Sequence, residues 1–120
     1  ISYIHSEALP AGELKHGTIS LITEGVPVIA CITAEGVAEK TINNIKEVKA
    51  RGAHVILAAK HGMCENADFC NDVIELPDAH EFVMPIAGIV PLQLYAYYTA
   101  VERGCDVDKP RNLAKSVTVE

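Results

Sequence analysis

Two short and nearly continuous apolar runs stand out along the chain, and each has the composition of a buried β-strand. Residues 26–33 read VPVIACIT and residues 54–59 read HVILAA. Uninterrupted aliphatic runs of this length suit strands that are covered on both faces, as in a parallel sheet. A shorter run, DVIEL at 72–76, predicts a third strand.

Helical patterns separate and follow these strands. Residues 37–51 place apolar side chains at helical spacing, which predicts an amphipathic helix. Glu39 near its start and basic residues near its end suit the helix dipole, and Gly52 is a favourable residue just after the helix end. A longer helix is predicted from Asp78, with Glu81 completing a capping box, to about Arg103. Pro91 is expected to bend that helix.

The order strand, helix, strand, loop, strand, helix predicts right-handed βαβ units, and therefore an α/β fold with a parallel sheet. Three strands are few for an open sheet, so we expect an upstream strand to be missing or supplied by a partner. Residues 1–8 resemble the end of a helix, and 18–22 a short helix. Because the chain begins with Ile1 rather than Met, we expect a fragment of a longer protein.

Residues 82–101 contain no charged side chain over a length that could cross a membrane. However, the segment contains Pro85, Gly88, Pro91 and Gln93, and its flanks are acidic rather than rich in Lys and Arg. A helix buried in a water-soluble α/β core therefore fits better, and no membrane partner is expected.

Composition narrows the possible functions. The net charge is −6, there is no Trp, and no basic run occurs, so a nucleic-acid partner is not expected. The spacing of Cys64 and Cys70 matches no usual zinc pattern, and Cys31 is expected to be a buried small hydrophobe. We expect no metal and no disulfide framework, which favours a reducing, cytoplasmic location.

The candidate chemistry lies near the two ends. Residues 7–17 read EALPAGELKHG, a loop punctuated by Pro and Gly that carries His16, Lys15 and two acids, Glu7 and Glu13. Histidine can move protons between sugar oxygens near neutral pH, and a lysine such as Lys115 can form a Schiff base with a carbonyl. No GxGxxG or P-loop is present.

These two end motifs, with PLQLYAYYTA between them, carry a resemblance over essentially the whole chain. EALPAGELKHG and the terminal DVDKPRNLAKSVTVE resemble the C-terminal end of the family of glutamine–fructose-6-phosphate aminotransferases (isomerising), also called glucosamine-6-phosphate synthases. The resemblance implies a three-layer α/β/α, flavodoxin-like sugar isomerase (SIS) fold. It identifies residues 1–120 as a partial second SIS subdomain with a catalytic tail at 105–120.

The resemblance also implies an activity and its residues. The family makes glucosamine 6-phosphate from fructose 6-phosphate and glutamine-derived ammonia, without pyridoxal phosphate or another cofactor. His16 matches the histidine that helps to open the sugar ring, reaching the active site of the neighbouring subunit. Lys115 matches the lysine that forms the Schiff base, and Ala114 lines the sugar site through its backbone.

Several family features are not in these 120 residues. They are the glutaminase domain, the first SIS subdomain with its phosphate-binding Ser/Thr loop, and a proton-shuttling glutamate that would precede Ile1. We therefore expect a homodimer partner, the two other domains of the same chain, and little activity from this fragment alone. Two alternatives stay open: a phosphosugar-binding SIS module without catalysis, and a related sugar-phosphate deglycase or deaminase.

Overall fold

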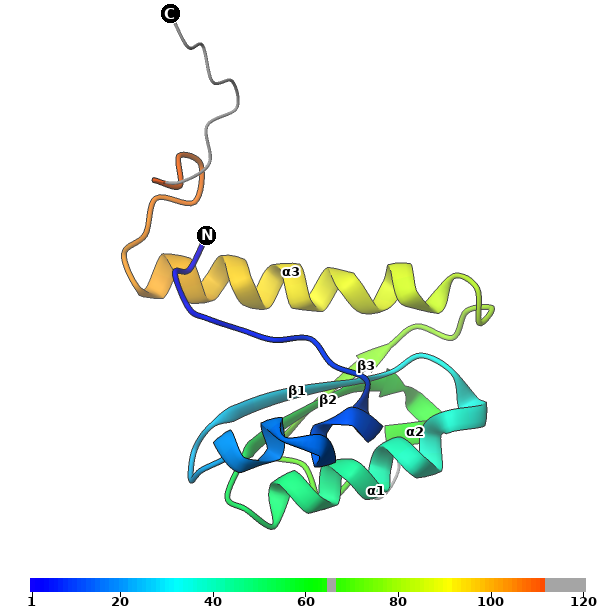
Figure 1. The fold of residues 1–120 in the computed structure, drawn as a ribbon. Coiled ribbons are helices and arrows are strands. Elements are labelled where there is room, and N and C mark those ends of the chain that lie inside the picture. Colours follow the sequence, from blue (N-terminus) through cyan, green and yellow to red (C-terminus); the bar gives the residue numbers. More distant parts are fainter. Residues whose placement is uncertain (65–66, 112–120) are drawn as a thin grey trace, which may run out of the picture. The chain divides into compact units, whose positions relative to one another are not determined.

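The computed structural model describes residues 1–64 and 67–111, and its centre is a three-stranded parallel sheet in the order β1-β2-β3 (Figure 1). The strands are β1 (Pro27–Ile32), β2 (His54–Lys60) and β3 (Asp72–Leu76). The three predicted strands and their parallel pairing are confirmed. The chain divides by its contacts into one unit of residues 7–91 and another of residues 1–6 with 92–120.

One face of the sheet is covered by α1 (Ala38–Lys49), which follows a 3₁₀ turn, η3 (Glu35–Val37). Ile45 and Val48 of α1 are buried in one cluster with alternate residues of β2, which are Val55, Leu57 and Ala59. Two further 3₁₀ helices, η1 (Ala11–His16) and η2 (Thr18–Leu21), lie on the same side of the sheet as α1 (Figure 1). Their residues Leu14 and Ile19 pack against the same cluster. The predicted loop at 7–17 is thus partly helical.

The opposite face of β2 forms a second cluster, in which Ala58 packs with Leu76 and with Met84 of α3 (Met84–Glu102). At Gly88, one turn further on, a Cβ would lie 3.3 Å from the Thr33 side chain, so a glycine lets α3 approach the sheet closely. Helices therefore cover both faces of β2, as the three-layer prediction requires.

The predicted start of the long helix at Asp78 is wrong. α3 begins at Met84, and the Asp78 carboxylate lies 3.2 Å from Lys60 Nζ instead of capping a helix. Pro85 explains the later start, because proline fits the first turn, where its missing N–H has no intrahelical partner. The helix continues through Pro91 and ends before Gly104, whose φ of 68° gives the left-handed C-terminal cap.

The prediction that this helix is buried is also wrong. Within residues 84–91, which belong to the same unit as the sheet, Met84 and Gly88 are buried, whereas large apolar side chains beside them are exposed, including Ile86 at 67%. The helix is apolar on all sides, and a sheet of three short strands can cover only one of them. Within the described residues, no helix combines the length and the apolar character needed to cross a membrane.

Two smaller expectations also fail. Residues 1–8 form no helix: Tyr3 has a φ of +55°, and its hydroxyl accepts a hydrogen bond from the Arg111 backbone N–H at 2.8 Å. Eight residues are in any case few for an isolated helix to nucleate. Cys31 is exposed rather than buried, because β1 is an edge strand and Cys31 points to the opposite face from Ile32.

The turn that joins α1 to β2 depends on a glycine. Gly52 has a φ of +91°, and an added Cβ would fall on the Glu24 carboxylate and 2.9 Å from Glu24 Cα. Replacing Gly52 with Ala is expected to lower the free energy of unfolding by about 1–3 kcal/mol, measured by urea denaturation. The matched control is Gly36→Ala, where nothing lies within 4 Å of the added Cβ. An equal, small effect of the two substitutions would contradict this prediction.

Candidate functional site

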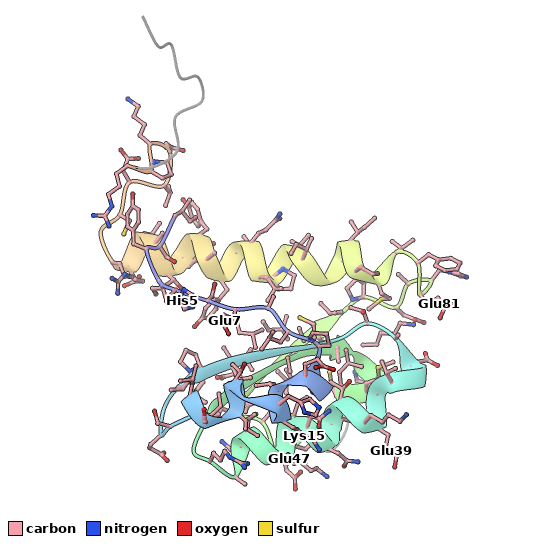
Figure 2. All side chains as sticks on the ribbon, viewed as in Figure 1. His5, Glu7, Lys15, Glu39, Glu47 and Glu81 are labelled. Atoms are coloured by element: carbon pink, nitrogen blue, oxygen red, sulfur yellow. The ribbon has the colours of Figure 1, made fainter. Side chains whose placement is uncertain are left out.

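The EALPAGELKHG segment is held to the first face of the sheet by its middle residues. Leu14 packs against the buried cluster under α1. Lys15 donates a hydrogen bond from Nζ to Glu47 Oε1 of α1 at 2.7 Å. The two side chains are labelled in Figure 2. Gly17, which follows η1 with a φ of 153°, turns the chain into η2. The segment is therefore a folded element fixed at two points.

His16 is the last residue of η1, and its side chain is exposed, like that of Glu13. An exposed imidazole at the end of a fixed element can reach a bound molecule or a second chain and exchange a proton with it. Glu7 lies on the non-helical segment that leads into η1 (Figure 2). Lys115 and Ala114, the other two predicted site residues, lie outside the described residues.

The beginning of the predicted tail is held by a turn around Asp106 and by contacts between Arg111 and Tyr3. The Asp106 carboxylate accepts hydrogen bonds from the backbone N–H groups of Asp108 and Lys109, at 3.0 and 2.9 Å. In addition to the hydrogen bond to Tyr3, the Arg111 guanidinium lies 4.2 Å from the centre of the Tyr3 ring. The tail therefore starts from a defined turn, and a cation–π contact fixes it to the N-terminal segment.

A second set of polar residues surrounds an open cavity of about 670 Å³ at the carboxyl edge of the sheet. Lys60, which ends β2, lies between Asp78 at 3.2 Å and Glu35 at 3.6 Å. The hydrogen bond to Asp78 is the main cause that raises the pKa of Lys60. Next to it, His61 Nδ1 lies 3.0 Å from the Glu75 carboxylate.

The protonated state of Lys60 limits the chemistry that this edge of the sheet can perform. A lysine that attacks a carbonyl must lose its proton, whereas Lys60 has a raised pKa and two carboxylate neighbours. Lys60 is thus poorly suited to form a Schiff base. No sequence motif marks this cluster. Lys60 and Glu75 lie near the carboxyl ends of β2 and β3, and Glu35 and Asp78 come shortly after β1 and β3. The carboxyl edge of an open α/β sheet is where ligands commonly bind, so the position of these residues along the sequence was a usable signal.

The cysteines add no metal centre among the residues that the structure describes. No group of three or more His, Cys, Asp or Glu side chains there is arranged to hold a metal ion. All four cysteines are free thiols. Cys64 donates a hydrogen bond to the Ala59 carbonyl at 3.3 Å, and Cys64 and Cys70 pack against the main cluster.

Cys70 is expected to be a slow nucleophile. Burial raises the pKa of its thiol to about 11, so only about 0.1% is thiolate at pH 8. Alkylation of Cys70 by iodoacetamide should therefore be about 100-fold slower in the folded protein than in urea, as followed by peptide mass spectrometry. Because the thiolate fraction rises with pH, the folded rate should still be increasing at pH 10. Equal rates in buffer and in urea would contradict this.

Comparison with known proteins assigns these features to a family. The family model for the SIS domain matches residues 1–103, which includes the sheet, η1 and α3. The chain belongs to the SIS domain family. The resemblance drawn from the two end motifs and the α/β prediction are both confirmed by this match and by the relatives below.

Curated relatives align with this SIS chain over all 120 residues. Glutamine–fructose-6-phosphate aminotransferase (isomerizing) from Caldanaerobacter subterraneus is 59% identical, and the enzyme of the same name from Thermus thermophilus is 56% identical. The chain spans 20% of the length of each. A solved structure, the C-terminal domain of glucosamine-fructose-6-phosphate aminotransferase from Francisella tularensis, has a TM-score of 0.85 and 42% identity, covering 92% of this chain and 31% of that one.

Proposed function

We propose that this chain is the C-terminal part of the isomerase domain of a glutamine–fructose-6-phosphate aminotransferase, and forms its second SIS subdomain. The observation that carries the proposal is the 59% identity to such an enzyme over every residue of the chain, both end motifs included. The whole protein would convert fructose 6-phosphate and glutamine-derived ammonia to glucosamine 6-phosphate. The exposure of His16 on a fixed element agrees with a role in that chemistry.

Three residues carry the proposed site. His16 gives a proton to the ring oxygen of the sugar and takes one from the anomeric hydroxyl, which opens the ring. Lys115 then attacks the exposed C2 carbonyl as a neutral amine, and loss of water gives the Schiff base. Ammonia displaces the lysine from that carbon. The backbone of Ala114 lines the sugar site beside Lys115.

The proposed partners follow from the length of the relatives, since this chain spans a fifth of it. A glutaminase domain and a first SIS subdomain in the same polypeptide would supply the ammonia and the phosphate site. A second copy would complete a homodimer in which His16 serves the neighbouring site. The proposed location is the cytoplasm, and the proposed reaction uses no cofactor.

The test is an assay of the full-length protein that contains this chain. With glutamine and fructose 6-phosphate it should form glucosamine 6-phosphate and glutamate in equal amounts, whereas the 120-residue chain alone should form neither. Sugar-phosphate binding without conversion would instead support a binding module. Release of ammonia from glucosamine 6-phosphate, without synthesis from glutamine, would support a deaminase.

A further inference from the structure

η1 presents three rows of side chains, and two of them are attached to the rest of the fold. In a 3₁₀ helix, residues three apart lie above one another. Ala11 and Leu14 form the row that faces the core, where Leu14 packs against the buried cluster. Lys15 belongs to the second row and reaches Glu47. The third row, Glu13 and His16, is left exposed.

The acceptor of Lys15 lies on a helix that is anchored in the core. Glu47 lies on α1 between Ile45 and Val48, which are 3% and 1% exposed. Its backbone carbonyl also accepts a hydrogen bond from Arg51 at 3.0 Å. Lys15 thus joins η1 to a helix whose neighbouring residues are fixed in the core, across 32 positions of sequence (Figure 2).

We propose that Lys15 is a positioning residue, whose ion pair with Glu47 fixes the rotation of η1 and so directs His16 outward. The inference rests on the proposed function of His16. Without the pair, the row of η1 that contains Lys15 would lose its hydrogen bond to α1, and η1 would be held on this side by packing such as that of Leu14. Both partners are close to half exposed, at 46% and 40%, so the pair should matter little for folding. Small displacements of a catalytic group, in contrast, can cost a large factor in rate.

A charge exchange in the full-length protein tests this inference. Lys15→Glu and Glu47→Lys each place two like charges together, and each should lower kcat for glucosamine 6-phosphate formation about tenfold or more, with KM within about twofold. The double variant K15E/E47K restores an ion pair in which the two charges have exchanged positions. It should recover kcat to within about threefold of the parent. Lys40→Glu, on the exposed part of α1, is the matched control and should keep parental kcat.

Hydrogen–deuterium exchange of residues 11–16 gives a readout that does not depend on activity. Exchange should be faster in both single variants and should return to the parental rate in the double variant. If the parent makes no glucosamine 6-phosphate, the proposed function fails, and the exchange data still decide whether the pair fixes η1. Unchanged exchange in the single variants would overturn the inference. So would a double variant that regains the exchange rate but not kcat, because Lys15 would then act on the substrate itself.

Discussion

Replacing Lys115 with Arg in the full-length protein is expected to abolish amino transfer, with kcat lowered at least about 1,000-fold. Arginine keeps the positive charge and much of the length of the side chain. Its guanidinium stays protonated at any working pH, so it cannot add to a carbonyl. The substitution therefore removes the nucleophile and leaves the charge, and a large loss would identify covalent chemistry as the role of Lys115.

Trapping the intermediate measures the same step directly. Borohydride added with fructose 6-phosphate should reduce the Schiff base to a stable amine, giving a mass increase on the peptide that contains Lys115. The variant Lys109→Arg is the matched control, because Lys109 lies in the turn at the start of the same tail, and it should keep kcat within about twofold. Labelling of a different lysine, or a Lys115→Arg protein with parental kcat, would refute the assignment.

The strands were predictable because each is marked by a run of apolar residues in the local sequence. Residues 55–59 of β2 are buried on both faces of the sheet, so this stretch is apolar without interruption, and the neighbouring strands β1 and β3 show the same pattern more weakly. The alternation of these runs with one amphipathic helix was enough to give the parallel sheet. The glycines at 52 and 104 marked helix ends correctly, since both have positive φ.

Two of the errors fell where residues far apart in the sequence make contact. Asp78 and Glu81 have the spacing of a capping box, but Asp78 pairs with Lys60, 18 residues away. Residues 1–8 have a helical composition, but Tyr3 contacts Arg111 across 108 positions. Periodicity and capping rules describe neighbours within a few turns, so neither contact could be read from them.

In the candidate site, too, local sequence features were predictable and contacts between distant residues were not. The EALPAGELKHG motif located His16, because its residue types and its resemblance to a family both pointed there. Nothing in the sequence paired Lys15 with Glu47, since the two lie on separate elements that only the fold brings together. Lys60 comes directly after the apolar run at 54–59 and carries no motif, although it ends β2 at the edge where the cavity lies.

Replacing His16 with Ala in the full-length protein is expected to lower kcat on fructose 6-phosphate by about 100- to 1,000-fold, while KM changes by less than about threefold. The imidazole would serve ring opening, which needs a proton at the ring oxygen and the removal of one from the anomeric hydroxyl. Alanine removes this proton transfer and leaves the sugar and phosphate contacts of other residues in place.

A substrate that cannot form a ring separates this role from others. A 5-deoxy analogue of fructose 6-phosphate lacks the hydroxyl that closes the furanose, so its carbonyl is always exposed. The His16→Ala protein and the parent should turn this analogue over at rates within about threefold of each other. The matched control is His80→Ala, another exposed histidine of the same chain, which should keep parental kcat on both substrates. An equal loss on the cyclic and open substrates would assign His16 to a later step.

The exposure of His16 makes this comparison informative. Its side chain belongs to neither buried cluster, so the substitution should leave the urea midpoint of unfolding unchanged. A fall in kcat could then not be attributed to lost stability. Lys15→Glu provides the complementary case, because it keeps the imidazole but releases the segment that carries it. If both variants lose rate on the cyclic substrate and retain it on the open one, ring opening depends on His16 and on the place where Lys15 and Glu47 hold it.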